Sequence, residues 1–228
     1  MLLEKILFES GKTLYFQPHV ADSPLKLKKL TLCAMPHFSA PPLSIENPLL
    51  YPPENDPKMK QSSPLSFATC DLCDAHKNDN SDEFKVLSPV FRDFGGIRKF
   101  SGPVVTVKCF EDNSLVKAAV DSPGEGRVLV VDGGASLRRA LLGGNLGAAA
   151  AKNGWAGVVI DGCVRDVAEL AQCRTGIRAL AAIPLPTEKH QAGQRDIAVQ
   201  VQGVWVRPGD WLYADEDGMV VVTSPPIA

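Results

Sequence analysis

A glycine-rich stretch, Gly143-Gly144-Asn145-Leu146-Gly147, immediately precedes an Ala-rich segment that we predict to be helical. Glycine lets a backbone approach a ligand closely, and the first turn of a helix offers unpaired N–H groups that favour an anion. No Gly-Lys-Ser/Thr follows and the GxGxxG spacing is absent, so neither a P-loop nor a dinucleotide site is expected. The stretch suits a small carboxylate, although a tight turn without any ligand explains the same glycines equally well.

A second motif, the run DGCVRDVAE at 161–169, follows a short apolar run and opens the next predicted helix. Arg165 has a planar fork suited to a carboxylate or to an oxygen that develops negative charge. Asp166 is a hard oxygen ligand of the kind that Mg²⁺ takes, and Glu169, on the same helical face, could hold metal-bound water. An isolated motif of this type is more often a surface ion pair at a helix start.

The elements that must position these motifs alternate between strand-like and helix-like segments from residue 67 onward, which predicts an α/β fold. Alternating runs near the end, split by Pro-Gly and Asp-Gly turn signals, predict an antiparallel β layer beside a partly parallel sheet. We expect helices at 69–77, 113–120, 146–153 and 167–173, and strands at 103–110, 127–131, 157–160, 177–183 and within 197–222.

Composition divides the chain near residue 66. Residues 1–66 hold ten of the 18 prolines, one of the 19 glycines and no arginine, so we predict a Pro-rich, poorly ordered extension followed by a domain at 67–228. The net charge of −2 argues against a nucleic-acid partner, and no apolar run approaches the ~20 residues of a membrane span. We expect a cytoplasmic protein, with organellar targeting by the extension left open.

Six cysteines occur without a recognisable secretory signal, so a disulfide framework is not expected. Cys70 and Cys73 have the spacing of a redox pair or of half a zinc site, but no second ligand pair follows. Apolar neighbours make ordinary burial the better interpretation, with a redox role as the alternative.

Taken together, the two motifs form the pattern of a known family: Gly144, twenty residues, Arg165-Asp166, two residues, then Glu169. On this pattern, residues 67–228 resemble the class II 4-hydroxy-4-methyl-2-oxoglutarate aldolases and their relatives named regulator of ribonuclease E activity A, the RraA-like family. The chain looks most like the short plant-type members. Further matches are TCDLCD at 69–74, VDGG at 131–134, GWAGVVI at 154–160, PGD at 208–210 and DEDG at 215–218.

The resemblance implies a three-layer β/β/α sandwich of the swivelling-domain type, assembled as a homotrimer with active sites between subunits. It implies that Gly143, Gly144, Asn145 and Leu146 hold the carboxylate of a small 2-keto acid. It also implies that Arg165 contacts the substrate oxygens, that Asp166 ligates Mg²⁺ or Mn²⁺, and that Glu169 acts through water.

The residue types agree with aldolase chemistry. Cleaving a C–C bond beta to a ketone leaves a pyruvate enolate, whose oxygen a divalent ion and Arg165 can stabilise. Because oxaloacetate gives the same enolate on losing CO₂, decarboxylation is expected as a second activity. A Schiff-base lysine is the rival design, but neither Lys152 nor Lys189 has an evident desolvating environment in the sequence.

Two other classes of function remain open. The family's second name suggests a protein that binds and inhibits an RNA-degrading enzyme, a role that would use the outer surface and tolerate an inactive site. A purely structural oligomer is the third interpretation, and it leaves the paired motifs unexplained. A metal-dependent assay of pyruvate release separates the three.

Overall fold

The computed structural model describes residues 66–223. The predicted extension lies outside the described residues apart from its last position, so its boundary stays a prediction. None of the helices between 66 and 223 is long and apolar enough to cross a bilayer.

The described elements, in chain order, are α1 (Thr69–Ala75), β1 (Phe84–Val86), β2 (Arg92–Asp93), β3 (Phe100–Lys108), α2 (Ser114–Val120), β4 (Val128–Leu142), α3 (Gly144–Lys152), β5 (Gly157–Val164), α4 (Val167–Leu170), β6 (Gly176–Ala182), β7 (Gln194–Arg195), β8 (Val199–Val201), β9 (Val204–Val206), β10 (Trp211–Ala214) and β11 (Met219–Val222).

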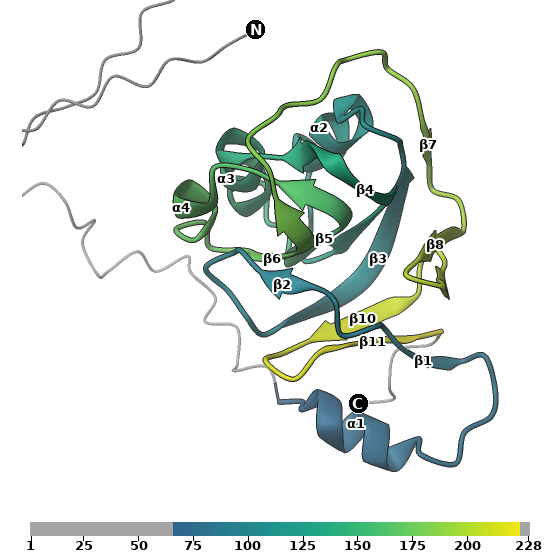
Figure 1. The fold of residues 1–228 in the computed structure, drawn as a ribbon. Helices are drawn as coiled ribbons and strands as arrows, with labels where there is room; N and C mark the ends of the chain where they lie inside the picture. The colour runs from purple at the N-terminus through teal and green to yellow at the C-terminus, as the bar shows by residue number, and fades with distance from the viewer. Residues whose placement is uncertain (1–65, 224–228) are drawn as a thin grey trace, which may run out of the picture. The chain divides into compact units, whose positions relative to one another are not determined.

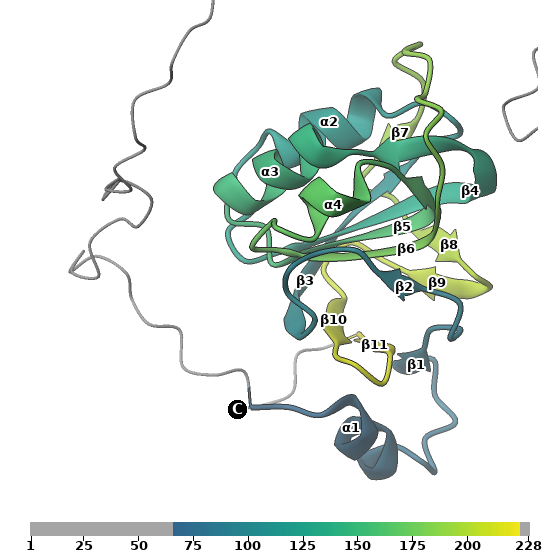
Figure 2. The same cartoon turned by 60° about the vertical axis from the view of Figure 1, so that its left-hand side comes forward.

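A nine-stranded mixed sheet forms the framework, in the order β1-β11-β10-β3-β4-β5-β6-β2, with β7 beside β3. The central pairs β3–β4, β4–β5 and β5–β6 are parallel, whereas β1, β2, β7, β10 and β11 pair antiparallel. A separate antiparallel hairpin, β8–β9, completes the β part. Helices α2, α3 and α4 cover one face of the parallel strands, and β8 to β11 lie on the opposite side (Figures 1 and 2). The predicted α/β architecture, with a partly parallel sheet and an antiparallel layer, is confirmed.

The central strands are apolar throughout because both of their faces are covered. In β4, Leu129 and Val131 join the core beneath the helices, while Val128 and Val130 join the core beneath the antiparallel strands, and all four are fully buried. Such two-sided burial is typical of parallel strands with a layer on each face. It explains why the sequence shows unbroken apolar runs here instead of alternation.

Strand β4 is much longer than the predicted run 127–131. It continues to Leu142, and its register against β5 shifts between Asp132 and Ser136, between Ser136 and Ala140, and again before Leu142. Residues 134–139 of this extension are exposed or half-buried, so they show no apolar pattern. These irregularities bend the end of β4 toward the glycine turn, a course that strand periodicity alone does not predict.

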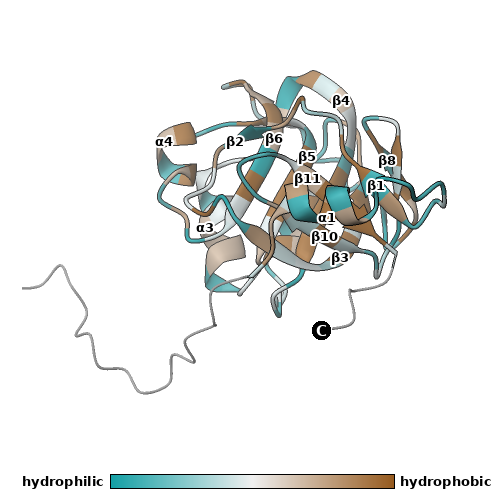
Figure 3. Cartoon of the chain, turned by 90° about the horizontal axis from the view of Figure 1, so that it is seen from below, coloured by the Kyte–Doolittle hydropathy of each residue, from teal (hydrophilic) through white to brown (hydrophobic). Residues whose placement is uncertain are grey.

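The first helix packs on the antiparallel end of the sheet. Phe67 and Leu72 contact a small core around Tyr213 and Val220, and Figure 3 shows the apolar colouring of β10 and β11 beneath α1. The helix begins at Thr69, as predicted, and Ala68 occupies the cap position without a side-chain cap bond. The Thr69 hydroxyl donates to Asp215 Oδ1 at 2.6 Å, which ties α1 to the β10–β11 turn.

Candidate active site

The glycine turn connects β4 to α3, as the sequence predicts. Gly143 occupies the cap position and α3 begins at Gly144, two residues earlier than expected. The Leu146 N–H donates to the Gly143 carbonyl oxygen at 3.0 Å, and the Gly144 N–H donates to Asp166 Oδ2 at 3.1 Å. Two of the four amides expected to face a substrate are therefore engaged inside the protein, whereas the Asn145 N–H donates to no residue in 66–223.

Acidic side chains lie against the turn at Gly143, the cap residue, and at Gly144, the first residue of α3. A Cβ atom added to Gly143 would lie 2.7 Å from Asp166 Oδ2, and one added to Gly144 would overlap Glu169 Oε2. Real Cβ atoms are not found so close to other heavy atoms. The glycines thus allow two carboxylates to approach the start of α3, where the helix dipole favours negative charge.

Arg165 and Asp166 lie at the junction between β5 and α4, which places them beside the glycine turn. The Arg165 N–H donates to the Leu142 carbonyl oxygen at 2.9 Å, joining the ends of β4 and β5. Asp166 has φ 57° and ψ 45°, a left-handed conformation that is uncommon outside glycine. It makes no side-chain cap bond to α4, and its carboxylate reaches back to the turn instead. A strained residue held this way is a common feature of functional sites.

The Arg165 guanidinium is close to the same carboxylate. Arg165 Nε lies 3.4 Å from Asp166 Oδ2, and the two side chains are 40% and 38% exposed. Both groups are therefore fixed against the turn while remaining open to a ligand. Asp166 Oδ1 makes no hydrogen bond with any described residue.

Glu169 does not share the cavity of Asp166. The expected α4 helix at 167–173 spans only Val167–Leu170, and Glu169 lines a neighbouring hollow with Asn145 and Arg174. Its carboxylate lies against Gly144, as Asp166 lies against Gly143, so the two acids face consecutive residues of the turn. The predicted role of Glu169 through water stays a prediction.

A cavity of about 390 Å³ opens between the glycine turn and the loop that follows β6. It brings together five predicted residues, although the sequence places them in two separate motifs. The remaining residues come from the start of α2, the end of β4 and the loop; of these, sequence reasoning named only Lys189, for the rival Schiff-base design. The predicted lining residues are Gly143, Asn145, Leu146, Arg165 and Asp166; the others are Asn113, Lys117, Ala140, Pro186, Thr187 and Lys189.

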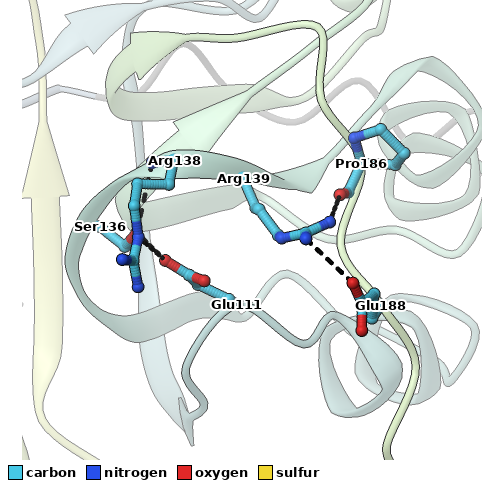
Figure 4. A network of polar contacts seen from close by, with 6 residues as sticks. All are labelled: Glu111, Ser136, Arg138, Arg139, Pro186 and Glu188. Atoms are coloured by element: carbon cyan, nitrogen blue, oxygen red, sulfur yellow. Dashed lines mark hydrogen bonds and ion pairs between the residues drawn. The ribbon is translucent and has the colours of Figure 1, made fainter.

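Residues 184–192 form the loop after β6, named the 184–192 loop. This loop is fixed to residues 132–142, the extension of β4 (Figure 4). Arg139 donates to the Pro186 carbonyl oxygen at 2.9 Å and pairs with Glu188 Oε1 at 2.9 Å. The Ala140 N–H also donates to the Leu185 carbonyl oxygen at 2.9 Å. In the same extension, Ser136 and Arg138 donate hydrogen bonds at 2.6 Å and 2.7 Å to Glu111, which lies between β3 and α2 (Figure 4).

Asp112 anchors the other end of the 184–192 loop. This residue is 1% exposed; its Oδ2 accepts from the His190 N–H at 2.7 Å and the Ala192 N–H at 3.1 Å, and its Oδ1 accepts from the Ser114 N–H at 2.7 Å. Burial alone would raise the pKa of Asp112, but these hydrogen bonds outweigh it and lower the pKa to about 2. One ionised carboxylate therefore joins the loop to the start of α2.

Asp161, the first residue of the second motif, lies away from the cavity. It is 3% exposed and accepts a hydrogen bond from Gln202 Nε2 at 2.7 Å. Burial raises the pKa of Asp161, opposed by the Gln202 hydrogen bond and reinforced by the charge of Asp132. It belongs to the packing between β5 and the β8–β9 hairpin.

The five described cysteines are free thiols. Cys70 is exposed, so the interpretation that both thiols of the CxxC pair are buried is wrong for Cys70, and Cys73 is half-buried. A hydrogen bond with Asp217 raises the pKa of Cys70, and burial raises the pKa of Cys73. A raised pKa disfavours the thiolate that redox chemistry requires.

Known proteins of similar sequence match the part of the chain that the structure describes. A family model described as RraA-like, Aldolase/RraA, matches residues 69–221. A protein of Albidiferax ferrireducens, provisionally named a 4-hydroxy-4-methyl-2-oxoglutarate aldolase, is 77% identical over 167 residues, which cover 70% of this chain and 96% of that protein. A Burkholderia mallei protein with the same provisional name is 59% identical over 158 residues, covering 69% and 96%.

The fold has solved counterparts as well. The structure of the RNA-processing inhibitor RraA from Thermus thermophilis is 46% identical, with a TM-score of 0.68, and the match covers 72% of this chain and 97% of that one. Sequence and fold therefore agree on the same family. The chain belongs to the RraA-like family.

Proposed function

We propose that the chain is a lyase, a divalent-metal-dependent class II aldolase that cleaves 4-hydroxy-4-methyl-2-oxoglutarate to pyruvate. The observation that supports this proposal most directly is that the glycine turn, Arg165 and Asp166 line the same cavity. The provisional aldolase names of relatives that are 77% and 59% identical support the same activity.

Asp166 is the residue that would hold Mg²⁺ or Mn²⁺. Its Oδ2 is engaged by the Gly144 N–H, which orients the carboxylate and leaves Oδ1 without a partner among the described residues. No group of three or more His, Cys, Asp or Glu residues is arranged around a common point in 66–223. A single carboxylate fits Mg²⁺, which commonly keeps waters and takes the remaining ligands from its substrate. When bound, the ion supplies Lewis-acid polarisation of the keto-acid oxygens.

The other residues of the turn and junction bind the substrate and stabilise charge. The Asn145 N–H, at the first turn of α3, can donate to the substrate carboxylate, with the helix dipole reinforcing the attraction. Arg165 then provides a fixed positive charge for the oxygen of the departing pyruvate enolate. Its contact with Asp166 holds the guanidinium in place before the substrate arrives, so little reorganisation is needed during the reaction.

Oxaloacetate decarboxylation would follow from the same arrangement. Loss of CO₂ from the β-carboxylate leaves the same enolate that C–C cleavage leaves, so the same charges stabilise both reactions. We therefore expect both activities to depend on Arg165 and Asp166 to a similar degree.

A Schiff-base mechanism is the competing way to stabilise the enolate. Lys189 lines the cavity, which its sequence context did not reveal, but the residue is exposed. A Schiff-base lysine is activated by a desolvating pocket or by a neighbouring cationic group, and an exposed position does not supply the pocket. Borohydride reduction in the presence of pyruvate should therefore leave the mass of the protein unchanged, and a covalent adduct on a lysine would contradict the class II assignment.

Regulation of an RNA-degrading enzyme is the second candidate function. The observation that favours it is the 46% identity to the structure named as an RNA-processing inhibitor. That function requires a protein-binding surface and not the cavity, so Asp166→Ala would leave it intact. A pull-down with an RNA-degrading enzyme, using wild type and this variant, distinguishes the two roles.

We also propose a cytoplasmic homotrimer with each cavity completed by a neighbouring subunit. The exposure of Arg165 and Asp166, 40% and 38%, supports this because a closed site would shield them more. Light scattering coupled to size exclusion measures the assembly directly.

The deciding experiment is a metal-dependent assay of pyruvate release. The full chain is stripped with a chelator and then assayed with 4-hydroxy-4-methyl-2-oxoglutarate before and after Mg²⁺ or Mn²⁺ is restored. We expect turnover only with the metal. Equal turnover in metal-free buffer, or none in either buffer, would contradict the proposal.

A further inference from the structure

Two lysines line the cavity together with Arg165 and have no role in the chemistry assigned above. Lys117 comes from α2 and Lys189 from the 184–192 loop. With Arg165 they give three positive side chains, against the single negative charge of Asp166. Because Arg165 and Asp166 offset each other's charge at 3.4 Å, the excess positive charge lies on the two lysines.

The two lysines differ in how far they are already neutralised. Lys117 pairs with Asp121, one helical turn along α2, and both side chains are about half exposed. Lys189 pairs with no carboxylate in 66–223, since its neighbour Glu188 is engaged by Arg139. An unpaired ammonium at a cavity wall favours an anionic ligand.

The same buried carboxylate holds the backbone close to both lysines. Asp112 accepts from the Ser114 N–H, one turn before Lys117, and from the His190 N–H, directly after Lys189. The hydrogen bonds of Arg139 to Pro186 and Glu188 hold the loop from the other side. Loops are commonly free to move, so five attachments within nine residues, at positions 185, 186, 188, 190 and 192, favour a loop whose backbone is held in place for binding.

We propose that Lys117 and Lys189 form a second anion subsite, which binds the distal carboxylate of a dicarboxylate 2-keto acid. The inference rests on the proposed function, in which the turn, Arg165 and Asp166 bind the 2-keto acid end. A ligand with a carboxylate at each end would then contact positive charge from two walls of the cavity. The subsite selects diacids over monoacids because the unpaired ammonium of Lys189, with Lys117 beside it, gains a charge-assisted hydrogen bond from a carboxylate and nothing from a methyl group.

The test compares two substrates that differ only at the distal group. 4-Hydroxy-4-methyl-2-oxoglutarate carries a carboxylate there, and 4-hydroxy-4-methyl-2-oxopentanoate carries a methyl group; both release pyruvate by the same bond cleavage. Wild type should show a higher kcat/KM for the diacid. Each single variant, K117A and K189A, should reduce this preference by about 10-fold or more, as expected for loss of one charge-assisted hydrogen bond.

Matched variants separate local recognition from general charge. K117A/K189A should abolish the preference, K189R should retain most of it, and K77A/K152A should leave it at the wild-type value. The last variant removes the same net charge from two exposed lysines outside the cavity. A preference that survives in K117A/K189A, or falls equally in K77A/K152A, would overturn the subsite.

An equilibrium measurement tests the subsite independently of turnover. Calorimetry with Mg²⁺ present compares 2-oxoglutarate with pyruvate as ligands of wild type and of K117A/K189A. Wild type should bind the diacid more tightly, and the double variant should bind the two ligands alike. If wild type turns over neither substrate but keeps this difference, the proposed function fails and the subsite stands; equal binding of both ligands by wild type, or of neither, overturns the subsite.

Discussion

The two walls of the cavity are held by different kinds of interaction. The wall with the glycine turn, Arg165 and Asp166 stands at the ends of strands whose last residues, Leu142 and Val164, are fully buried. The opposite wall is the exposed 184–192 loop, which is fixed by polar contacts from Asp112 and Arg139. Packing of the sheet sets the position of the first wall, and a few hydrogen bonds set the position of the second.

The difference assigns different tasks to the two walls. Groups that must meet a reacting centre need positions fixed to a fraction of an ångström, and strand ends in a packed core provide this. Groups that only recognise the far end of a ligand tolerate more variation and are commonly carried by loops. Changes in the first wall should therefore lower kcat, and changes in the second should mainly raise KM.

The largest effect is expected at Asp166. Asp166→Ala removes the proposed metal ligand and the acceptor of the Gly144 N–H, so kcat for both cleavage and decarboxylation should fall on the order of 10³-fold or more. Circular dichroism should show an intact fold, and Asp82→Ala, at an exposed acid outside the cavity, serves as the control. Near-wild-type turnover by Asp166→Ala in metal-free buffer would make the class II assignment wrong.

Arg165→Lys should have the next largest effect. Lysine keeps the positive charge but loses the planar fork, so kcat should fall on the order of 10²-fold, the cost of one lost donor to a developing oxyanion. Steady-state kinetics with the diacid measure the loss. Unchanged kinetics would show that Arg165 is only a surface ion-pair partner of Asp166 and takes no part in catalysis.

Asp112→Asn tests the second wall. The amide group would face backbone N–H groups, costing about 1–3 kcal/mol of unfolding free energy, and KM should rise more than kcat falls. The low pKa of Asp112 stabilises the folded state above the ordinary carboxyl pKa, and this contribution is lost as the pH falls toward 2. Urea unfolding between about pH 4 and pH 2 should accordingly show a flatter pH dependence for the variant than for wild type. If kcat falls while KM stays constant, Asp112 acts on the wall that holds Arg165 and Asp166, and the division of tasks between the two walls is wrong.

Removal of residues 1–64 should have the smallest effect. Both walls come from residues 112–192, and the family match begins at residue 69, so the shortened chain should fold, assemble and turn over substrate much as the full chain does. Limited proteolysis with mass spectrometry should yield the same fragment. An insoluble fragment, or one with a different assembly, would show that the first residues are structural.

The first wall could be predicted from the sequence and the second could not. The glycine turn and the Arg165-Asp166 pair are local patterns, and each carries a residue type with a recognisable chemistry. The second wall depends on a hydrogen bond between Asp112 and His190, 78 positions apart, which no spacing rule indicates. The loop also follows an extension of β4 whose exposed residues show no strand periodicity.

The positions of the elements were predicted better than their ends. The strands at 157–160 and 177–183 are present, but β5 continues through the first residues of the second motif to Val164. Left-handed Asp166 separates β5 from α4, and that backbone conformation is not encoded by residue type. Register shifts and a short α4 therefore appear at the junction where the site is built.

The close approach of Asp166 to Gly143 also offers a way to interpret related chains whose activity has not been measured. Any side chain at the position of Gly143 would bring a carbon to 2.7 Å from the Asp166 carboxylate and force it to move. In a relative that keeps the acid but replaces this glycine, the carboxylate would thus occupy a different position relative to the turn. The residue before α3 and the acidic residue share one space, so a survey of relatives could be sorted by the two positions together.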